Sequence, residues 1–341
     1  MKTLIQYLKE LNTEYRCHRN LMQIESRLIR IIGDGNVYKK QELLKHFTSE
    51  KELNKTINNI KSYGLNLIQE GNHYQLENSL EFLSESNIYN HLSELGCTQN
   101  LCISVKDILR STSREFNPSD IDAKQIQVSL AEYQTSGRGR QNRTWISPFA
   151  SGICLSVYQQ ITYASFPVGL SVFIGIELIK CLKKLRLRRL SIKWPNDIYV
   201  KDRKLGGLLV ELHQTNSQTL VANVGLGINY KLPGIHSWGG NVEFNPIDIS
   251  EIQESTYLSR NLLVAHFINS ITNSLLSFNG DSLKITQSDW RDLDMLFNKE
   301  LTIKVGNQII KGINKGIDGE GRLILETNGL VKTVVSGHII G

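Results

Sequence analysis

The spacing of apolar residues changes twice along this chain, and these changes constrain the fold more than any other feature of the sequence. Before about Ser79 apolar residues recur at helical spacing, and beyond it helical runs mix with strand-like runs. From Glu300 onward, short strand-like runs follow one another. A chain of 341 residues is also long enough for two or three domains. We therefore predict an α+β protein with domains at residues 1–78, 79–298 and 299–341.

The first domain has the pattern of a winged helix-turn-helix that follows an N-terminal extension. Apolar residues on one face predict its first helix, at Leu21, Ile24, Leu28, Ile31 and Ile32. A second helix is predicted at Lys39–Phe47. Ser49 and Glu52 predict a capping box that opens a third helix, which ends near Gly64. Two short extended runs around Gly71-Asn72 then predict a hairpin.

The third helix of this domain is predicted to carry a polar outer face. Its buried face would be Leu53, Ile57 and Ile60, which turns five polar residues outward: Lys51, Asn54, Lys55, Asn58 and Lys61. Lysines suit phosphate contacts and asparagines can read adenine edges, so this face predicts DNA binding. The alternative is a small interaction domain whose outer face is ordinary solvated surface.

The second and third domains are predicted from strand-like runs. In the second domain we predict a sheet backed by helices, with antiparallel neighbours where the connections are short. Its strands are expected at Gln125–Gln134, Gly152–Tyr158, Leu190–Val200, Lys204–Leu212 and Thr219–Tyr230, and its helices at Pro167–Leu185 and Leu258–Phe278. The third domain is predicted to be a small barrel with turns at Gly306-Asn307, Asp318-Gly319 and Asn328-Gly329.

Composition narrows the class of protein. Hydrophobic residues make up 40% and charged residues 21%, as in globular proteins, and no apolar run reaches the length of about 18 residues that spans a bilayer. The charged N-terminal segment argues against a secretory signal. Five cysteines without CxxC spacing argue against a disulfide framework or a structural zinc site. We expect a cytoplasmic protein with no membrane contact, and the net charge of +6 is compatible with nucleic-acid contact.

The segment most informative about function is AEYQTSGRGRQNRTW, residues 131–145. Three arginines and two glycines fall within the seven residues Gly137–Arg143, which we call the arginine loop. Guanidinium groups suit phosphate or carboxylate, and we expect Gly137 and Gly139 to allow close backbone approach and positive φ. The pattern predicts a mobile loop that closes over an anion, although an arginine-rich turn can also be plain solvated surface.

Two more polar segments are expected at strand ends. Lys193–Asp197 (KWPND) offers a lysine and a carboxylate on a backbone stiffened by proline, and Asp202–Gly207 (DRKLGG) places a lysine beside two glycines. Either segment alone could be a solvated turn. Together with the arginine loop they collect cations that would suit a carboxylate attacking the α-phosphate of ATP, because both reactants are anions.

Other chemistry finds less support in the sequence. The Walker pattern of a P-loop is absent, and GRGRQNR fails the GxGxxG pattern because Asn142 stands at the third glycine position. No nucleophile elbow or metal-spaced histidine cluster supports a hydrolase, and His213 and His236 are isolated.

These motifs resemble those of a known family, the biotin protein ligases. With the predicted N-terminal domain, the chain resembles the bifunctional bacterial type of this family, which also represses the biotin operon. The resemblance runs from about Leu21 to the C-terminus. It rests on AEYQTSGRGR, KWPND, DRKLGG with the following LLVEL, VGLGIN and GINKGIDGEGRLILE. It implies a mixed-sheet α/β ligase domain followed by a small SH3-like β-barrel.

The resemblance also implies a two-step reaction and its partners. With Mg²⁺ as the cofactor, biotin and ATP would react to give biotinyl-5′-AMP. The biotinyl group would then pass to a lysine of the biotin carboxyl carrier protein of acetyl-CoA carboxylase. Repression would require operator DNA and a homodimer of the adenylate-bound protein.

By family position, the resemblance implies roles for particular residues. The catalytic groups would be Lys204, Lys193 and Arg140. Biotin would be bound by Ser111, Thr112, Ser113, Gln134, Arg138, Gly139, Arg140 and Lys204. ATP phosphates would be contacted by Arg138, Arg140, Arg143, Lys193 and Asn229, and Asp197 would help to hold magnesium.

The sequence departs from the family pattern in the biotin segment and in the arginine loop. Arg110-Ser111-Thr112-Ser113 replaces the usual Asp-Ser-Thr-Asn, Pro118 interrupts the helix expected to follow, and Gln141-Asn142 replaces a basic residue and a glycine. Two alternatives remain open. One is a lipoate or octanoate transferase of related fold, and the other is a ligand-sensing transcriptional repressor with impaired ligase activity.

Overall fold

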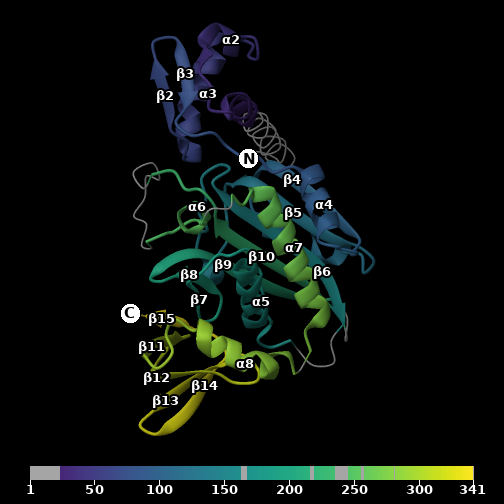
Figure 1. The fold of residues 1–341 in the computed structure, drawn as a ribbon, viewed down its shortest axis with the longest axis vertical. Helices are drawn as coiled ribbons and strands as arrows, with labels where there is room; N and C mark the ends of the chain where they lie inside the picture. Colours follow the sequence, from purple (N-terminus) through teal and green to yellow (C-terminus); the bar gives the residue numbers. More distant parts are fainter. Residues whose placement is uncertain are drawn as a thin grey trace, which may run out of the picture. The chain divides into compact units, whose positions relative to one another are not determined.

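A computed structural model describes residues 24–162, 167–215, 219–234, 245–254, 257–279 and 281–340. This part of the chain forms two compact units (Figure 1). The smaller, N-terminal unit contains the chain up to Phe82, together with Ser147–Ser151 and residues 232–234. The larger unit contains the rest, so the two units are interleaved along the sequence. No helix in the described ranges is both long and apolar enough to cross a membrane.

The described part of the N-terminal unit contains the three helices and the hairpin that were predicted, and a short strand, β1, that was not predicted extends the hairpin to a three-stranded antiparallel sheet. Its helices are residues 24–32, α2 (Lys40–Leu44) and α3 (Glu50–Ile60), followed by a 3₁₀ turn, η1 (Lys61–Tyr63). Strand β1 (Tyr38–Lys39) pairs with β3 (His73–Leu76), which pairs with β2 (Leu67–Glu70). The predicted first-helix position Leu21 lies outside the described residues.

Helix α3 begins and packs largely as its sequence predicts. Ser49 Oγ accepts a hydrogen bond from the Glu52 N–H at 3.2 Å. The reciprocal half of the predicted capping box is wrong, because the Glu52 carboxylate accepts from the Thr48 N–H at 2.8 Å instead. The buried face is Leu53, Thr56, Ile57 and Ile60, and all five predicted outward residues are exposed: Lys51, Asn54, Lys55, Asn58 and Lys61.

The N-terminal unit includes a segment that the sequence did not predict there. Phe149, which follows the arginine loop, is fully buried with its ring edge-on to Tyr63 and Phe82, at centroid distances of 6.2 and 6.5 Å. The Phe149 N–H donates to the Tyr63 carbonyl at 2.9 Å. Ser147–Ser151 therefore completes the apolar core of a unit formed mostly by residues more than sixty positions earlier.

The larger unit is built on a seven-stranded sheet in the order β4-β5-β6-β10-β9-β8-β7. Every pairing is antiparallel except β4–β5, which is parallel. The strands are β4 (Leu101–Leu109), β5 (Ile126–Gln134), β6 (Gly152–Thr162), β7 (Leu190–Lys193), β8 (Asp197–Val200), β9 (Arg203–Gln214) and β10 (Thr219–Asn229). The expected antiparallel neighbours around Asp202-Arg203 and Thr215 are confirmed.

Two predictions for this sheet need correction. Strand β4 was missed, and so was helix α4 (Glu85–Glu94) before it. The single strand predicted over Leu190–Val200 is two strands, β7 and β8, joined by a turn through Trp194–Asn196. An apolar run with a β-branched character predicts extended chain but does not show where that chain reverses, and here the proline-containing turn was the available signal.

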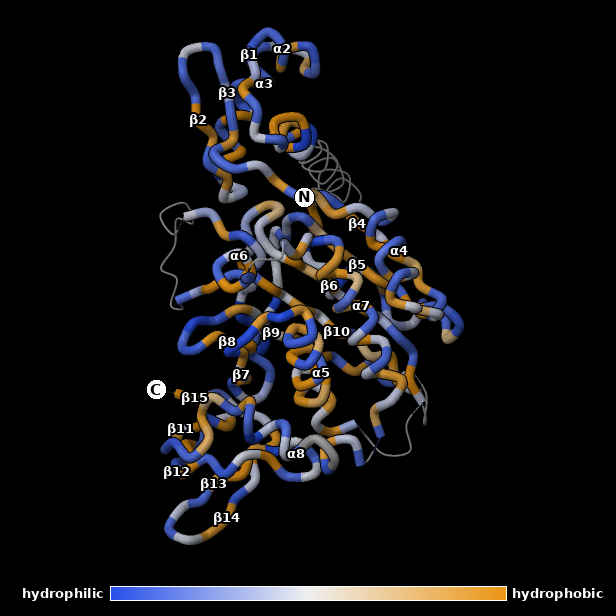
Figure 2. Tube along the Cα trace, viewed as in Figure 1, coloured by the Kyte–Doolittle hydropathy of each residue, from blue (hydrophilic) through white to orange (hydrophobic). Residues whose placement is uncertain are grey.

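The two faces of the sheet differ in chemistry. Along β10, Ala222, Val224, Leu226 and Ile228 belong to the apolar core beneath α5 (Leu170–Lys184) and α7 (Arg260–Ser277). Figures 1 and 2 show these helices over the sheet, with apolar residues concentrated on α5 and the strands beneath it. The alternate β10 residues, Asn223, Gly225, Gly227 and Asn229, point to the other side. We call that side the polar face.

The C-terminal region is a five-stranded antiparallel sheet in the order β14-β13-β12-β11-β15. Its strands are β11 (Glu300–Val305), β12 (Gln308–Ile317), β13 (Leu323–Thr327), β14 (Leu330–Val334) and β15 (His338–Ile340). The three predicted turns all fall between these strands. Helix α8 (Ser282–Leu293), which was not predicted, leads into this sheet, and the short helix α6 (Ile249–Ile252) precedes α7.

Two hydrogen bonds attach the C-terminal region to the β7–β8 turn within the larger unit. The Met295 N–H donates to the Ile192 carbonyl at 3.1 Å, and the Trp194 indole N–H donates to the Gly321 carbonyl at 3.1 Å. They lie on either side of Lys193. The C-terminal region thus holds the Ile192 backbone and the Trp194 side chain, on either side of a residue predicted to be catalytic.

Candidate active site

Strand register brings the charged residues of two motifs into one row on the polar face. Lys193 pairs with Asp197, Asp197 with Gly207, and Gly207 with Gly227, across β7, β8, β9 and β10. Directly paired residues point to the same side of a sheet. An irregularity between β8 and β9 then brings Lys204 toward this row, where its Nζ lies 2.9 Å from Asp197 Oδ1.

Gly207 leaves the space in which Lys204 and Asp197 meet. A β-carbon at Gly207 would lie 2.8 Å from Asp197 Oδ1 and 3.7 Å from Lys204 Cε. A β-carbon at Gly227 would fall within 2.4 Å of the Trp145 ring, over which the Lys204 ammonium lies at 5.9 Å. The glycines of this row therefore make room for larger side chains.

The arginine loop is a narrow turn with a paired base. Arg138 and Thr144 form an antiparallel bridge, and the Gly139 N–H donates to the Arg143 carbonyl at 2.7 Å. The predicted positive φ at Gly137 and Gly139 is wrong: the left-handed residues are Gln141 (φ 55°) and Asn142 (φ 60°) at the tip. Close approach at Gly137 is confirmed, because a β-carbon there would lie 2.3 Å from the Trp145 carbonyl oxygen.

The three arginines of the loop face different partners. Arg140 donates to Asn196 Oδ1 at 3.3 Å, which places it beside the β7–β8 turn. Arg138 is paired with Glu211 on β9, and Arg143 donates to the imidazole of His338 on β15 at 2.7 Å. The structure thus brings Arg140, Lys193, Asp197 and Lys204 together, and we call these four residues the charged cluster. Arg138 and Arg143 make their hydrogen bonds to residues outside this cluster.

Burial changes the acid–base properties of this cluster. It lowers the pKa of Lys193, an effect that Lys204 and Arg143 reinforce and Asp197 opposes. It also lowers the pKa of Arg140, with Asp197 opposing and Arg143 reinforcing. Both shifts show that the protein holds cations close together in a partly desolvated place, where they act strongly on a bound anion.

Uncharged polar groups gather farther along the polar face, in the segment predicted to bind biotin. The Thr112 N–H donates to Gln134 Oε1 at 2.8 Å, and Ser156 Oγ donates to Thr112 Oγ1 at 2.8 Å. Tyr158 Oη donates to the Thr112 carbonyl at 2.5 Å. Ser111 and Ser113 contact each other through their hydroxyls at 3.1 Å. The expected helix after this segment is only the single 3₁₀ turns η2 (Thr112–Arg114) and η3 (Pro118–Asp120).

Asn229, at the end of β10, contacts the backbone of Lys204, a member of the charged cluster. Its amide nitrogen donates to the carbonyls of Lys204 at 3.2 Å and Ile247 at 3.0 Å, and the residue is 5% exposed. In this position Asn229 holds the Lys204 backbone, with its amide committed to main-chain oxygens. That arrangement does not match the direct phosphate contact expected from the sequence.

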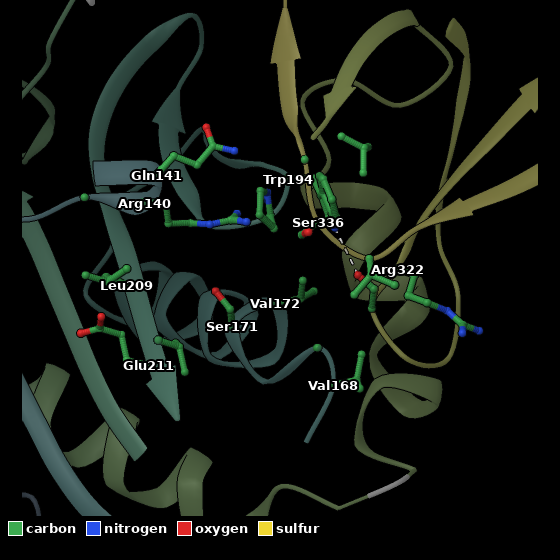
Figure 3. Close-up of a pocket in the computed structure, with 18 of the residues that line it drawn as sticks. Arg140, Gln141, Val168, Ser171, Val172, Trp194, Leu209, Glu211, Arg322 and Ser336 are labelled. Atoms are coloured by element: carbon green, nitrogen blue, oxygen red, sulfur yellow. Dashed lines mark hydrogen bonds between the residues drawn. The ribbon is translucent and has the colours of Figure 1, made fainter. Parts of the chain in front are cut away.

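A pocket of about 480 Å³ opens beside the charged cluster (Figure 3). It is lined by the arginine loop, the start of α5, Trp194-Pro195, residues 209–211 of β9 and the C-terminal residues 304–306, 320–322 and 335–337. Arg140 extends from the arginine loop toward Trp194 in this view. Glu211 lies on strand β9. Sequence reasoning missed Glu211 and the C-terminal contribution; the LLVEL segment after DRKLGG was the one available signal for Glu211.

The residues present are compatible with a magnesium ion that is carried by a phosphate ligand. Among the described residues no group of three or more His, Cys, Asp or Glu side chains could hold a metal. Mg²⁺ in phosphate-transfer sites is commonly held by one or two carboxylates and by the phosphates themselves. Asp197, whose Oδ1 lies 2.9 Å from Lys204 Nζ, can supply one such carboxylate.

Comparisons with known proteins agree with this geometry. The chain matches a model of the biotin/lipoate A/B protein ligase family over residues 107–229 and one of the biotin protein ligase C-terminal domain over residues 296–340. The bifunctional ligase/repressor BirA of Escherichia coli is 32% identical over 72% of this chain and 75% of its own length. That of Bacillus subtilis is 24% identical over 75% of this chain and 78% of its own length.

Solved structures share the fold. A biotin protein ligase from Aquifex aeolicus, solved with biotin and ATP, superposes with a TM-score of 0.55 at 23% identity, covering 71% of this chain and 97% of that one. Its structure without ligands gives a TM-score of 0.53. The fold is thus that of a protein ligase, and its sheet carries a cluster of cations. The chain belongs to the biotin protein ligase family.

We expect Gly207→Ala to reduce adenylate formation about tenfold or more, because the new methyl group would separate Asp197 from Lys204 and misplaced reacting groups lose rate steeply. The measurement is biotin-dependent exchange of pyrophosphate into ATP. Gly175→Ala in α5 is the matched control, since the nearest atoms to its β-carbon lie at 3.6 and 3.8 Å. Equal rates for the two variants would contradict this role of Gly207.

We expect Lys193→Arg to extend activity to higher pH. Lys193 is expected to act as a cation. Burial lowers its pKa, so it loses its proton at a lower pH than a free lysine does. Arginine stays charged above pH 12 or so. The pH profile of kcat/KM for pyrophosphate exchange should therefore lose or shift its alkaline limb in the variant. An unchanged limb would assign it to another group.

Proposed function

We propose that this protein is an ATP-dependent ligase that forms biotinyl-5′-AMP and transfers biotin to a lysine of the biotin carboxyl carrier protein. The observation that carries the proposal is the charged cluster. Three of its four members are cations: Lys193 and Lys204 come from strands of the sheet, and Arg140 comes from the arginine loop that lines the pocket. Such a site suits a reaction between two anions, the biotin carboxylate and ATP. The uncharged segment suits the neutral ring system of biotin.

The uncharged segment would recognise the ring system of biotin. Thr112, Gln134 and Ser156 offer both donors and acceptors, as a cyclic urea requires, and they are already ordered by one another. The biotin carboxylate would then reach toward Lys204. Ser111 and Ser113 would border this segment. Arg110 stands in place of the carboxylate of the usual family pattern, and the Ser113 hydroxyl stands in place of its amide.

In the first step a biotin carboxylate oxygen would attack the α-phosphorus of ATP, and pyrophosphate would leave. Lys204 and Lys193 offset negative charge on the reacting phosphate, and Arg140 does so from the arginine loop. Lys193 and Lys204 need little reorganisation because strands hold them. Magnesium, held by Asp197 and the phosphates, would supply further neutralisation of charge.

In the second step the ε-amine of the carrier lysine would attack the acyl carbon, and AMP would leave. Since the nucleophile belongs to the carrier, this chain needs to supply none. The arginine loop, with Arg138, Gly139 and Arg140, would cover the adenylate and exclude water from a hydrolysis-prone anhydride. Arg143 would extend this cover toward the C-terminal sheet, and Asn229 would act by holding the Lys204 backbone.

Biotin is favoured over lipoate or octanoate by one finding in particular. The family model for the larger unit covers both biotin and lipoate ligases, but the C-terminal match is to a domain of biotin protein ligases. We infer that the C-terminal sheet is the small SH3-like barrel expected from the sequence. The predicted domain limits of 1–78, 79–298 and 299–341 belong to the same proposal.

We further propose that the N-terminal unit is a winged helix-turn-helix that binds operator DNA. Support comes from the exposed polar face of α3, the β2–β3 hairpin and the bifunctional ligase/repressor relatives. Two half-sites would require a homodimer, formed when the adenylate is bound. A cytoplasmic location fits both the acceptor protein and the operator. A repressor without ligase activity is the second candidate.

The decisive experiment is incubation of the full chain with ATP, magnesium, biotin and a carrier domain. We expect biotinylation of the carrier, and no comparable labelling with lipoate. Lys204→Ala should abolish adenylate formation, whereas Lys201→Ala, an exposed lysine in the β8–β9 turn, should not. Absence of carrier biotinylation by the wild-type chain would favour the repressor without ligase activity.

DNA binding is tested by its salt dependence. If Lys55 neutralises a phosphate, Lys55→Ala should reduce the slope of log K against log salt by about 0.9. Lys284→Ala, in an exposed ion pair of the larger unit, should leave the slope unchanged. The measurement is a titration of operator DNA at several salt concentrations. A slope unaffected by Lys55→Ala would argue for a protein-interaction role of α3.

A further inference from the structure

The arginines of the loop differ in whether an acid neutralises them. Arg138 donates to both carboxylate oxygens of Glu211, at 2.9 and 2.8 Å. Arg140 faces an amide oxygen and Arg143 an imidazole, and both of these partners are neutral when they accept a hydrogen bond. Arg138 therefore brings little net charge to a bound phosphate, in contrast to the other two arginines.

Glu211 is itself fixed to the sheet. It lies in the middle of β9, directly opposite Asn223 on β10. The Asn223 amide donates to Glu211 Oε2 at 3.5 Å and to the Ser113 carbonyl at 2.9 Å, and Asn223 is 1% exposed. The Arg138 guanidinium also contacts Ser113 Oγ at 3.5 Å. One cluster thus joins the loop, two strands and the predicted biotin segment.

Arg138 is also well placed to control the loop mechanically. It stands at the base of the arginine loop, where it bridges to Thr144. Both it and Glu211 line the pocket, and their side chains are only 28% and 24% exposed. A bidentate arginine–carboxylate pair with limited water access is stronger and more directional than a surface pair.

We propose that Glu211 is a positioning residue that latches the arginine loop over the polar face through Arg138. This inference deepens the proposed ligase function and rests on it. The latch separates two tasks within the loop: Arg138 holds the loop closed, and Arg140 supplies charge to the adenylate. Glu211 thereby determines how long the reactive intermediate is retained rather than how fast it forms.

The first test measures retention of the adenylate by the full chain. In Glu211→Gln the shape remains but the charge is lost, so we expect biotinyl-AMP to dissociate about five- to tenfold faster, with single-turnover formation changed by less than about threefold. The exchanged pair Arg138→Glu with Glu211→Arg should restore retention. Glu254→Gln, in an exposed pair with Arg188, is the matched control.

The second test needs no substrate. Trypsin can cut after Arg140 and Arg143, so the rate of cleavage within the loop of the ligand-free chain reports loop opening. We expect Glu211→Gln to be cut about five times faster than the wild type, and added salt to speed cleavage of the wild type more than that of the variant. Arg138→Lys keeps the positive charge but cannot bond both carboxylate oxygens of Glu211 as a guanidinium does. Its cleavage rate should lie between those of the wild type and Glu211→Gln.

The outcomes separate the latch from the ligase function. If the wild type forms no biotinyl-AMP while Glu211→Gln still opens the loop, the proposed function fails and the latch stands. If the wild type forms adenylate and Glu211→Gln matches it in both retention and cleavage, the latch is wrong. Slow adenylate formation with normal retention in Glu211→Gln would also overturn the latch, because it would place Glu211 in the chemistry.

Discussion

The register of the seven-stranded sheet is the constraint on which the site depends. Side chains alternate between faces, and the face beneath α5 and α7 is closed by an apolar core, so the other face receives the intervening residues. Lys193, Asp197, Gly207 and Gly227 share a row only in this register. A slip of one residue in β9 would bury the wrong side chains, and the core therefore enforces the geometry of the charged groups.

The charged cluster holds like charges close together. Three cations share one carboxylate, and burial lowers the pKa of two of them. The apolar core supplies the stability that holds them together, and under the proposed function a bound anion would relieve the repulsion that folding imposes. Preorganised charge of this kind acts without rearrangement at the moment of reaction.

Sequence reasoning succeeded where a local pattern has a local physical cause. Glycine-containing turns separated the C-terminal strands, and the helical spacing of Leu53, Ile57 and Ile60 identified the buried side of α3. The charged cluster followed from motifs in which lysines, an acid and glycines lie close in sequence. Family resemblance added the identity of the ligands, which spacing alone could not provide.

The side-chain partners that were missed were missed for a different reason: they are distant in sequence. Arg138 and Glu211 are 73 positions apart, and Arg143 and His338 are 195 apart. Nothing near either residue indicates which acid or imidazole it will face. The left-handed tip at Gln141-Asn142 was missed because glycine is the usual occupant of that conformation, and two glycines stood nearby.

The placement of Phe149 has a consequence for how this protein can be divided. The chain leaves the larger unit after Ile146, contributes one aromatic ring to the core around Tyr63 and Phe82, and returns at Gly152 to begin β6. A fragment lacking the first 82 residues would keep Phe149 but lose Tyr63 and Phe82, the rings that bury it. The main chain therefore joins the two units at more than one place, and a truncation within the sequence cannot separate them without exposing Phe149.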